Sequence, residues 1–123
     1  MDNLTSKNDR FLRRVHQDID DNLSNENYSV ECLAKNTGLS RSMLHRKLKQ
    51  LTGKSAGDLI TEKRLEKACQ LLSNQVGTVS EIAYQVGFNS PSYFNRVFKK
   101  KYQVDKKLLW NEYVLNYVPE FFF

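Results

Sequence analysis

The sequence has 123 residues, of which 40% are hydrophobic and 27% charged, as is typical of a globular protein rather than a disordered one. No apolar run approaches the roughly 18–20 residues that a transmembrane helix needs, and the opening MDNLTSKNDR lacks the apolar stretch of a secretory signal. Of the net charge of +5, the positive part is concentrated in residues 41–107, which carry fourteen Lys and Arg against five Asp and Glu. These features argue against membrane insertion by this segment and favour a cytoplasmic protein that contacts phosphate.

The apolar residues recur at helical spacing along most of the chain. The spacing predicts a first amphipathic helix near residues 8–23. Ser29 and Gly38 are typical of the start and end of a short second helix, and Ser40 and Gly53 bracket a third. The side chains expected to point inward in these three helices are Phe11, Leu12, Val15, Ile19, Leu23, Val30, Leu33, Ala34, Leu44, Leu48 and Leu51.

The second half of the chain continues the same pattern. A longer helix is predicted at 56–73, followed by a short helix that the capping box Thr78-x-x-Glu81 starts. Ser90 and Pro91 fit the N-cap and first position of another helix. No segment alternates long enough to predict a strand, so we expect an all-α fold. The side chains expected to point inward here are Leu59, Ile60, Leu65, Ala68, Leu71, Leu72, Val79, Ile82, Ala83, Val86, Phe94, Val97 and Phe98.

An internal repeat is the most informative feature of the sequence. Residues 33–49 align with residues 82–100, with a period of 49 residues before a glycine turn and 50 after it. Each copy predicts a short helix, a turn in which glycine takes a left-handed conformation, and a second helix, which is the helix-turn-helix pattern. The matching pairs are Leu33-Ala34 with Ile82-Ala83, Gly38-Leu39 with Gly87-Phe88, Leu44-His45-Arg46 with Phe94-Asn95-Arg96, and Leu48-Lys49 with Phe98-Lys99.

The second helix of each copy has a polar face opposite its apolar face. Arg can donate two hydrogen bonds to guanine, Asn can pair with adenine, and Ser and His are adaptable partners in the major groove. A single polar face of this kind is equally well explained by solvation, but two in one register on a repeated turn favour DNA recognition. The residues at positions i, i+3, i+4 and i+7 are Ser42, His45, Arg46 and Lys49 in the first copy, and Ser92, Asn95, Arg96 and Lys99 in the second.

The helix at 56–73 joins the two copies. Its 18 residues correspond to about 27 Å, a length compatible with two recognition helices set about one duplex turn, roughly 34 Å, apart. Basic side chains beside the recognition helices are candidate phosphate contacts, which position a protein without specifying sequence. These side chains are Lys49, Lys54, Lys99, Lys100 and Lys101.

Residues 11–102, about three quarters of the chain, resemble the DNA-binding domain of the AraC/XylS family of bacterial transcription regulators. The resemblance implies about seven helices in two homeodomain-like helix-turn-helix subdomains, at 1–55 and 74–123, joined by the linker helix at 56–73. It also implies sequence-specific binding of double-stranded DNA in transcription regulation, with one recognition helix in each of two successive major-groove segments. The residues that carry the resemblance are Leu33, Ala34, Gly38, Leu39, Ser40, Leu44, Arg46, Thr52, Gly53, Arg64, Ala68, Leu71, Leu72, Ile82, Ala83, Val86, Gly87, Phe88, Tyr93, Phe94, Arg96, Phe98, Lys99 and Lys100.

The resemblance further implies which residues and partners the domain uses. An upstream sensory or receiver domain, as in two-component systems, and RNA polymerase are the protein partners that it suggests. The family's base-reading positions fall on Arg41, Ser42, His45, Arg46, Ser92, Tyr93, Asn95 and Arg96.

The chain departs from the family pattern after Tyr102. The family has a glycine and a Ser-Pro start to its last helix, where this chain has Gln103 and no such pair. The segment at 103–123 is compatible with a divergent helix, a partner-binding tail or an altered end. The departure bears on how the second subdomain packs, and hence on its share of DNA affinity.

Enzymes, protein-interaction modules and RNA-binding domains are the alternatives to DNA binding. His16 and His45 form no catalytic motif and no Gly-rich phosphate loop is present, so we do not expect an enzyme. Lone Cys32 and Cys69 predict small core residues, with no disulfide framework, metal site or cofactor. A protein-interaction module and an RNA-binding domain remain alternatives, but the repeated register of Arg46 and Arg96 favours duplex DNA.

Overall fold

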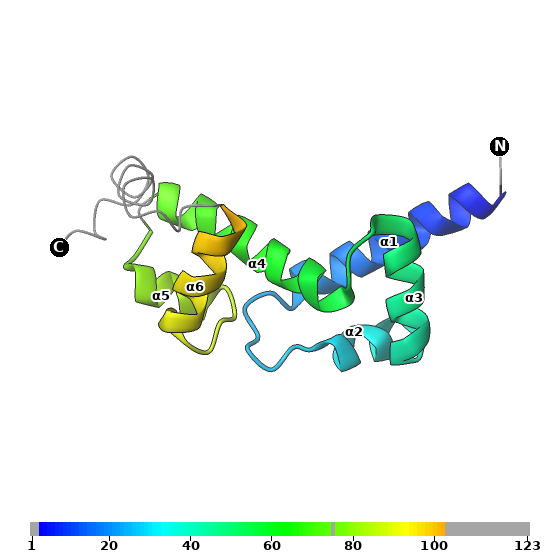
Figure 1. Ribbon diagram of the computed structural model, residues 1–123, viewed down its shortest axis with the longest axis horizontal. Coiled ribbons are helices and arrows are strands. Elements are labelled where there is room, and N and C mark those ends of the chain that lie inside the picture. The colour runs from blue at the N-terminus through cyan, green and yellow to red at the C-terminus, as the bar shows by residue number, and fades with distance from the viewer. Residues whose placement is uncertain (1–2, 75, 103–123) are drawn as a thin grey trace. The chain divides into compact units, whose positions relative to one another are not determined.

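The computed structural model describes residues 3–74 and 76–102, and all regular structure among them is α-helical (Figure 1). The prediction of an all-α fold is confirmed for these residues. The seventh helix that the resemblance implies falls outside the described residues, so it stays a prediction. The six described helices are α1 (Asn3–Asp21), α2 (Val30–Thr37), α3 (Arg41–Thr52), α4 (Ala56–Ser73), α5 (Val79–Gln85) and α6 (Pro91–Lys101).

The first helix differs from its predicted range of 8–23, because α1 runs from Asn3 to Asp21. Asn22 ends it: the Asn22 backbone N–H donates to the Ile19 carbonyl at 3.1 Å, and its side-chain Nδ2 donates to the Asp18 carbonyl at 2.8 Å. These two bonds satisfy carbonyl groups that would otherwise be unpaired at a helix C-terminus.

Four of the helices begin at the hydroxyl side chain that the sequence predicts for them. The hydroxyl accepts the backbone N–H three residues later, at 3.4 Å for Ser29 and at 3.2 Å for Ser40, Thr78 and Ser90. The Thr78 hydroxyl also donates to the Glu81 carboxylate at 3.1 Å. Each cap satisfies one of the N–H groups left unpaired at a helix N-terminus, which fixes where the helix begins.

The two glycine turns have the same hydrogen bonds as well as the same sequence pattern. Gly38 has a φ of 74° and Gly87 a φ of 96°, both in the left-handed region that favours glycine. In each turn the glycine and the apolar residue after it donate to carbonyl groups of the preceding helix, which is the Schellman arrangement. The bonds are Leu39 to Ala34 (3.0 Å), Gly38 to Lys35 (3.1 Å), Phe88 to Ala83 (3.0 Å) and Gly87 to Tyr84 (3.0 Å).

The chain forms two compact units that divide within α4, between Lys63 and Arg64. α4 therefore contributes to both cores, and the three-part division into 1–55, 56–73 and 74–123 stays a prediction. The first core contains Val15, Ile19, Tyr28, Leu33, Ala34, Leu44, Leu48, Ala56, Leu59 and Ile60. The second core contains Leu65, Ala68, Leu72, Ile82, Ala83, Val86, Phe88, Phe94 and Phe98.

Some predicted core positions are less buried than expected. Leu51, Leu71 and Val97 are half-buried, and so are Cys32 and Cys69, neither of which is in a disulfide in the described part of the chain. Cys32 lies in the first turn of α2, where its sulfur accepts a hydrogen bond from the Ser29 hydroxyl at 3.4 Å. The prediction that the cysteines are core residues is therefore wrong in degree: both lie at the margin of a core.

A buried tyrosine in the loop between α1 and α2 helps to join these two helices. Tyr28 precedes the α2 cap, and its hydroxyl donates to Asp18 Oδ2 on α1 at 2.5 Å. Asp18 also accepts from Asn36 Nδ2 on α2, at 3.0 and 3.1 Å. Sequence periodicity does not identify Tyr28 as a core residue, because it lies in the loop between two helices. It helps to fix α2, and hence the turn that leads into α3.

Candidate nucleic-acid interface

In α3 the buried and exposed side chains lie on opposite faces. Leu44 and Leu48 are completely buried and hold the helix against the first core. The predicted base-reading side chains are all exposed, and these are Arg41, Ser42, His45 and Arg46. The structure therefore places four candidate residues together on one solvent-facing side of a single helix.

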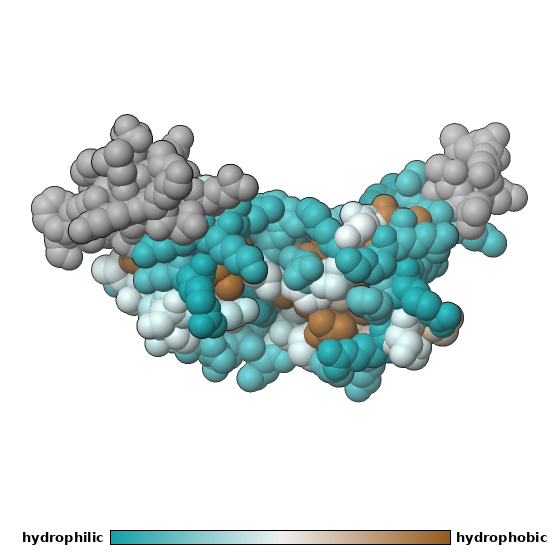
Figure 2. Space-filling view, in the orientation of Figure 1, coloured by the Kyte–Doolittle hydropathy of each residue, from teal (hydrophilic) through white to brown (hydrophobic). Residues whose placement is uncertain are grey.

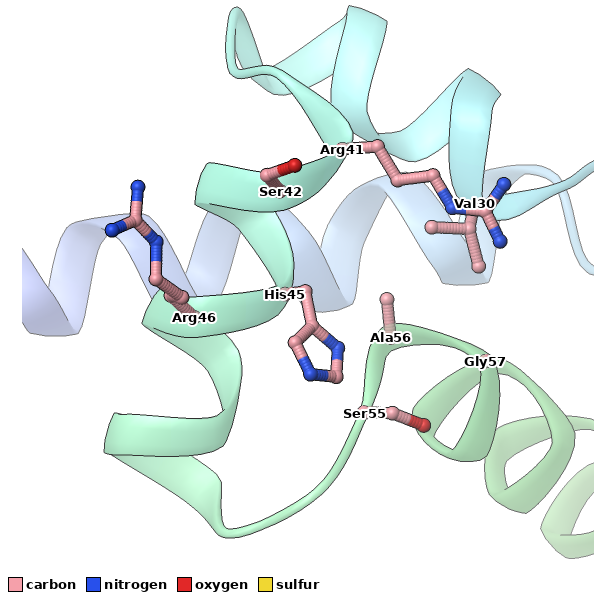
Figure 3. A pocket seen from close by; sticks show the side chains of 8 residues that line it. All are labelled: Val30, Arg41, Ser42, His45, Arg46, Ser55, Ala56 and Gly57. Atoms are coloured by element: carbon pink, nitrogen blue, oxygen red, sulfur yellow. The ribbon is translucent and has the colours of Figure 1, made fainter.

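This face of α3 borders an open groove whose other walls are the starts of α2 and α4 (Figure 3). Figure 3 shows His45 extending toward Ser55 and Ala56, Arg41 toward α2, and Arg46 away from both. A ligand lying along α3 would meet donors that point in several directions. That arrangement suits a long, polar ligand better than a small molecule enclosed in a pocket.

Arg41 is ion-paired with Glu31 in the first turn of α2. The two side chains are 68% and 60% exposed, so water and salt reach the pair. A backbone hydrogen bond, the Ser29 hydroxyl and the charge of Arg41 hold the pKa of the Glu31 carboxyl below its ordinary value of 4.5. Glu31 is therefore ionised at neutral pH and competes with any phosphate for Arg41.

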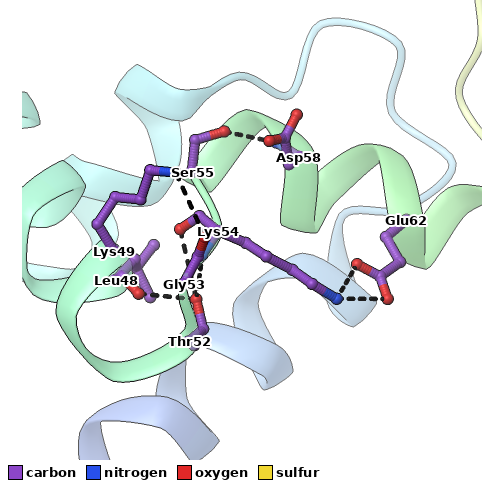
Figure 4. Close-up of polar contacts among 8 residues, drawn as sticks. All are labelled: Leu48, Lys49, Thr52, Gly53, Lys54, Ser55, Asp58 and Glu62. Carbon is purple, nitrogen blue, oxygen red and sulfur yellow. Dashed lines mark hydrogen bonds and ion pairs between the residues drawn. The ribbon is translucent and has the colours of Figure 1, made fainter.

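The two lysines predicted near the end of α3 also have partners (Figure 4). Lys54 donates to both carboxylate oxygens of Glu62 on α4, at 2.6 and 2.9 Å, and Lys49 donates to the Gly53 carbonyl at 3.3 Å. The Lys54 backbone N–H donates to the Thr52 hydroxyl at 3.1 Å, which fixes the turn from which the lysine extends. A phosphate that approached either lysine would compete with this existing partner for the ammonium group.

The second recognition helix, α6, repeats part of this pattern. Ser92, Tyr93 and Arg96 are exposed, opposite the buried Phe94 and Phe98. The Arg96 guanidinium lies over the Tyr93 ring, with its central carbon 5.2 Å from the ring centre.

Asn95 differs from the other candidates on α6. It is half-buried, and its side-chain oxygen is buried with no hydrogen-bond partner in the described structure. An unpaired buried oxygen is unfavourable. Because the oxygen is buried, it is not available to accept a hydrogen bond from adenine in this conformation, so such recognition would need another side-chain conformation.

The lysine cluster at the end of α6 has a structural role of its own. Lys99, Lys100 and Lys101 occupy the last turn of the helix, where the backbone dipole places partial negative charge. Positive side chains stabilise a helix at that end whether or not DNA is bound. Lys100 and Lys101 are exposed and Lys99 is half-buried.

The carboxylate partners are the residues of this interface that sequence reasoning missed. Glu31 lies ten residues before Arg41, and Glu62 lies eight residues after Lys54. Neither pair lies on one helix: Glu31 and Arg41 belong to α2 and α3, and Lys54 lies in the turn before α4, which carries Glu62. A search restricted to the three- and four-residue spacings of ion pairs within one helix does not detect them.

Hydrophilic residues cover most of the face that Figure 2 shows, and its apolar areas are small and separate. None of the described helices is long and apolar enough to cross a membrane. The large apolar side chains that are exposed in the described chain are Met43, Val76, Tyr84 and Tyr93.

Two kinds of sequence comparison bear on this interface. The sequence pattern of a helix-turn-helix domain family matches residues 33–105. Histidine kinase P4 of Formosa agariphila is 34% identical over 110 residues, which are 89% of this chain and 8% of that protein. The HTH-type transcriptional activator RhaS of Salmonella paratyphi B is 33% identical over 97 residues, 79% of this chain and 34% of that protein. The chain thus spans well under half the length of these two relatives.

Solved structures give the same result. The C-terminal domain of the two-component response regulator yesN from Fusobacterium nucleatum has a TM-score of 0.69 and 32% identity, over 77% of this chain and 92% of that one. A transcriptional regulator from Chromobacterium violaceum, described as containing an AraC-type DNA-binding domain, has a TM-score of 0.72 and 26% identity, over 80% and 87%. The repeated turn, the two polar recognition helices and these matches agree: the chain belongs to the AraC-type family of helix-turn-helix DNA-binding domains, which serve transcription regulation.

Proposed function

We propose that the chain binds one asymmetric site on double-stranded DNA by inserting α3 and α6 into successive major-groove segments. The observation that carries this proposal is that the two units repeat the same turn hydrogen bonds and the same exposed arginine. Both units have the same Schellman bonds at Gly38 and Gly87, followed by a serine-capped helix with an exposed arginine, Arg46 or Arg96, in the same register. Because the turns match while the neighbouring side chains differ, the two helices would recognise different base pairs.

Arg46 and Arg96 are the proposed main determinants of sequence. Each extends from the middle of its helix, and an arginine there can donate two parallel hydrogen bonds to the O6 and N7 atoms of guanine. The remaining proposed base-reading residues are Arg41, Ser42 and His45 on α3, and Ser92, Tyr93 and Asn95 on α6. Serines near the start of a helix reach either bases or phosphates, so their contribution depends on the sequence bound.

The lysines are proposed to contact phosphate. Lys49 and Lys54 would do so by exchanging the Gly53 carbonyl and the Glu62 carboxylate for phosphate. Lys99, Lys100 and Lys101 would do so from the last turn of α6. Such contacts add affinity without sequence preference and make it depend on salt. The 18 residues of α4 correspond to about 27 Å, compatible with two half-sites about one helical turn apart.

We propose further that this segment acts by binding rather than by catalysis, within a longer cytoplasmic regulator. Its similarity to the histidine kinase covers 8% of that protein, so the similarity does not carry a kinase activity to this chain. The proposed protein partners are an upstream sensory or receiver domain, which would control DNA binding, and RNA polymerase, which the bound domain would recruit or position. Direct binding of purified RNA polymerase on promoter DNA tests the latter.

Selection of bound sequences from a random duplex library tests the central proposal. The selection is done at near-physiological salt with competitor DNA, because low salt exaggerates binding that lacks sequence preference. Enrichment of two different half-sites about one helical turn apart is the expected result. A single half-site would mean that one helix does not read DNA. No enrichment, with binding that disappears as salt rises, would refute sequence-specific recognition and favour a protein-interaction module.

A further inference from the structure

Three side chains of the second unit form a series of contacts, from Phe88 through Tyr93 to Arg96, that base reading alone does not explain. The centres of the Tyr93 and Phe88 rings lie 5.9 Å apart, and the guanidinium carbon of Arg96 lies 5.2 Å from the centre of the Tyr93 ring. Phe88 is buried, and its ring packs edge-on against Phe94 at 5.2 Å. The Tyr93 ring is therefore anchored to the core through Phe88 and contacts a cation at the surface.

From this geometry we infer that Tyr93, which stands among the proposed base-reading residues, acts through Arg96 as a positioning residue: its ring holds the Arg96 guanidinium in the orientation that reads a base pair. The inference rests on the proposed function, in which Arg96 contacts guanine. Tyr93 and Arg96 are three residues apart on α6 and so are neighbours on the helix surface. Stacking covers a flat face of the guanidinium and leaves its N–H donors free at the edge. The same arginine can therefore stack on Tyr93 and donate two hydrogen bonds to a base.

Holding the arginine before DNA arrives has an energetic consequence. A free arginine has many rotamers, and it loses this freedom when it docks against a base. A side chain that is already stacked loses less. A cation–π contact at an exposed site corresponds to about a two- to fivefold factor in an equilibrium constant, which sets the size of the expected effect.

The first unit provides an internal comparison. Met43 occupies the position of Tyr93 in the repeat, three residues before Arg46, and Leu39 occupies the position of Phe88. Leu39, Met43 and Arg46 border one shallow groove, and Met43 is 50% exposed. Arg46 has no aromatic ring contact within the described part of the chain, so the two arginines differ in how firmly they are held. Tyr93→Met therefore installs the residue that the repeat itself uses at this position.

The test measures binding to the selected operator and to an operator changed at the base pair that Arg96 reads. The variants are Tyr93→Met, Tyr93→Phe, Arg96→Ala and the Tyr93→Met/Arg96→Ala double variant. Tyr93→Met is expected to lower operator affinity and base-pair discrimination about two- to fivefold. It should have no further effect when Arg96 is already alanine, and Tyr93→Phe should rescue discrimination because it keeps the ring.

Two further measurements separate positioning from a general structural role. Tyr84→Met is the matched control, because Tyr84 is also an exposed tyrosine of this unit but lies on α5. It is expected to leave discrimination unchanged. In the free protein, the ring current of Tyr93 should shift the Arg96 side-chain protons upfield in NMR spectra of the wild type and of Tyr93→Phe. This shift should be lost in Tyr93→Met.

The outcomes that overturn the inference are distinct from one another. If Tyr93→Phe loses as much discrimination as Tyr93→Met, the hydroxyl contacts DNA and the ring does not act as a platform. If Arg96→Ala abolishes discrimination while Tyr93→Met retains it, the positioning role is wrong and the proposed function stands. If Arg96→Ala itself changes nothing, both the role of α6 in recognition and the inference built on it are wrong.

Discussion

Replacing Glu62 by glutamine tests whether Lys54 contacts DNA phosphate. In the unbound domain, the Lys54 ammonium donates to both Glu62 oxygens at 2.6 and 2.9 Å, and the two side chains are 45% and 21% exposed. If Lys54 contacts phosphate, DNA binding replaces the carboxylate with a phosphate oxygen. Glu62→Gln removes the competing charge before DNA arrives, so we expect tighter binding.

The magnitude follows from the exposure of the pair. Ion pairs that solvent reaches are worth about 0.2–1 kcal/mol, so affinity should rise between about 1.4-fold and fivefold. The unfolding free energy of the domain should fall by no more than about 1 kcal/mol for the same reason. Log affinity falls as log salt concentration rises, and Lys54→Ala should make this slope less steep by about 0.9, the value for one phosphate contact on duplex DNA.

The assay is fluorescence-anisotropy titration of an operator duplex at several salt concentrations. Glu66→Gln is the matched control, because it removes the same charge from the same helix at an exposed residue four positions later. Both variants gain any general benefit of losing a negative charge, and only Glu62→Gln releases Lys54. Equal affinities for the two variants, or a salt slope unchanged by Lys54→Ala, would refute a phosphate contact by Lys54.

Three other predictions concern the recognition residues, the turn and pH. Arg46→Ala and Arg96→Ala should each cost about 1–3 kcal/mol in operator binding and relax preference at one base pair, as a repeated library selection would reveal. Gly38→Ala should lower the unfolding free energy by about 1–2 kcal/mol in thermal or denaturant unfolding, because φ is 74° and alanine is strained there. No atom lies within 4 Å of the added carbon, so steric overlap adds nothing to this cost. Gly38→Asn should cost less, since asparagine tolerates this conformation. Because its folded pKa is lowered, the Glu31 carboxylate stabilises the fold above its ordinary pKa of 4.5, and this stabilisation is lost as pH falls through the lower folded value. The difference in Tm between wild type and Glu31→Gln should therefore disappear in acid, and a difference that persists there would contradict it.

The parts of the fold that depend on local chemistry could be predicted from sequence. The hydroxyls of Ser29 and Ser40 cap the helices that they were expected to start, and α4 spans the predicted range of 56–73. Caps and glycine turns are local, because a side chain satisfies backbone groups within a few residues of itself. The repeat could be predicted for the same reason: Gly38 and Gly87 each form the same bonds with the preceding helix.

What the sequence did not predict depends on contacts between segments. Tyr28 is buried in the first core with its hydroxyl bonded to Asp18 of α1, and no helical period includes a loop residue. The carboxylate partners of Arg41 and Lys54 lie on neighbouring helices, α2 and α4, so the sequence could name candidate residues but not the ion pairs that they form in the unbound protein. Asn95 lies on the same predicted polar face of α6 as Arg96, yet its side-chain oxygen is buried. The position of a residue along a helix predicts the direction in which its side chain leaves the backbone, but the rotamer decides which of its atoms solvent reaches.

The carboxylates beside the recognition surface give a physical reason for selectivity in a domain of net charge +5. A basic domain binds any duplex through its free cations, and that binding increases with each cation available to phosphate. Here Glu31 and Glu62 are paired with Arg41 and Lys54 in the unbound domain, so a phosphate contact by either cation would exchange one anion for another. Such an exchange gains little free energy on a random duplex. If Arg46 and Arg96 contact bases as proposed, those contacts would hold the helices in place on the operator and make the exchange favourable there, so these ion pairs should reduce random binding more than operator binding.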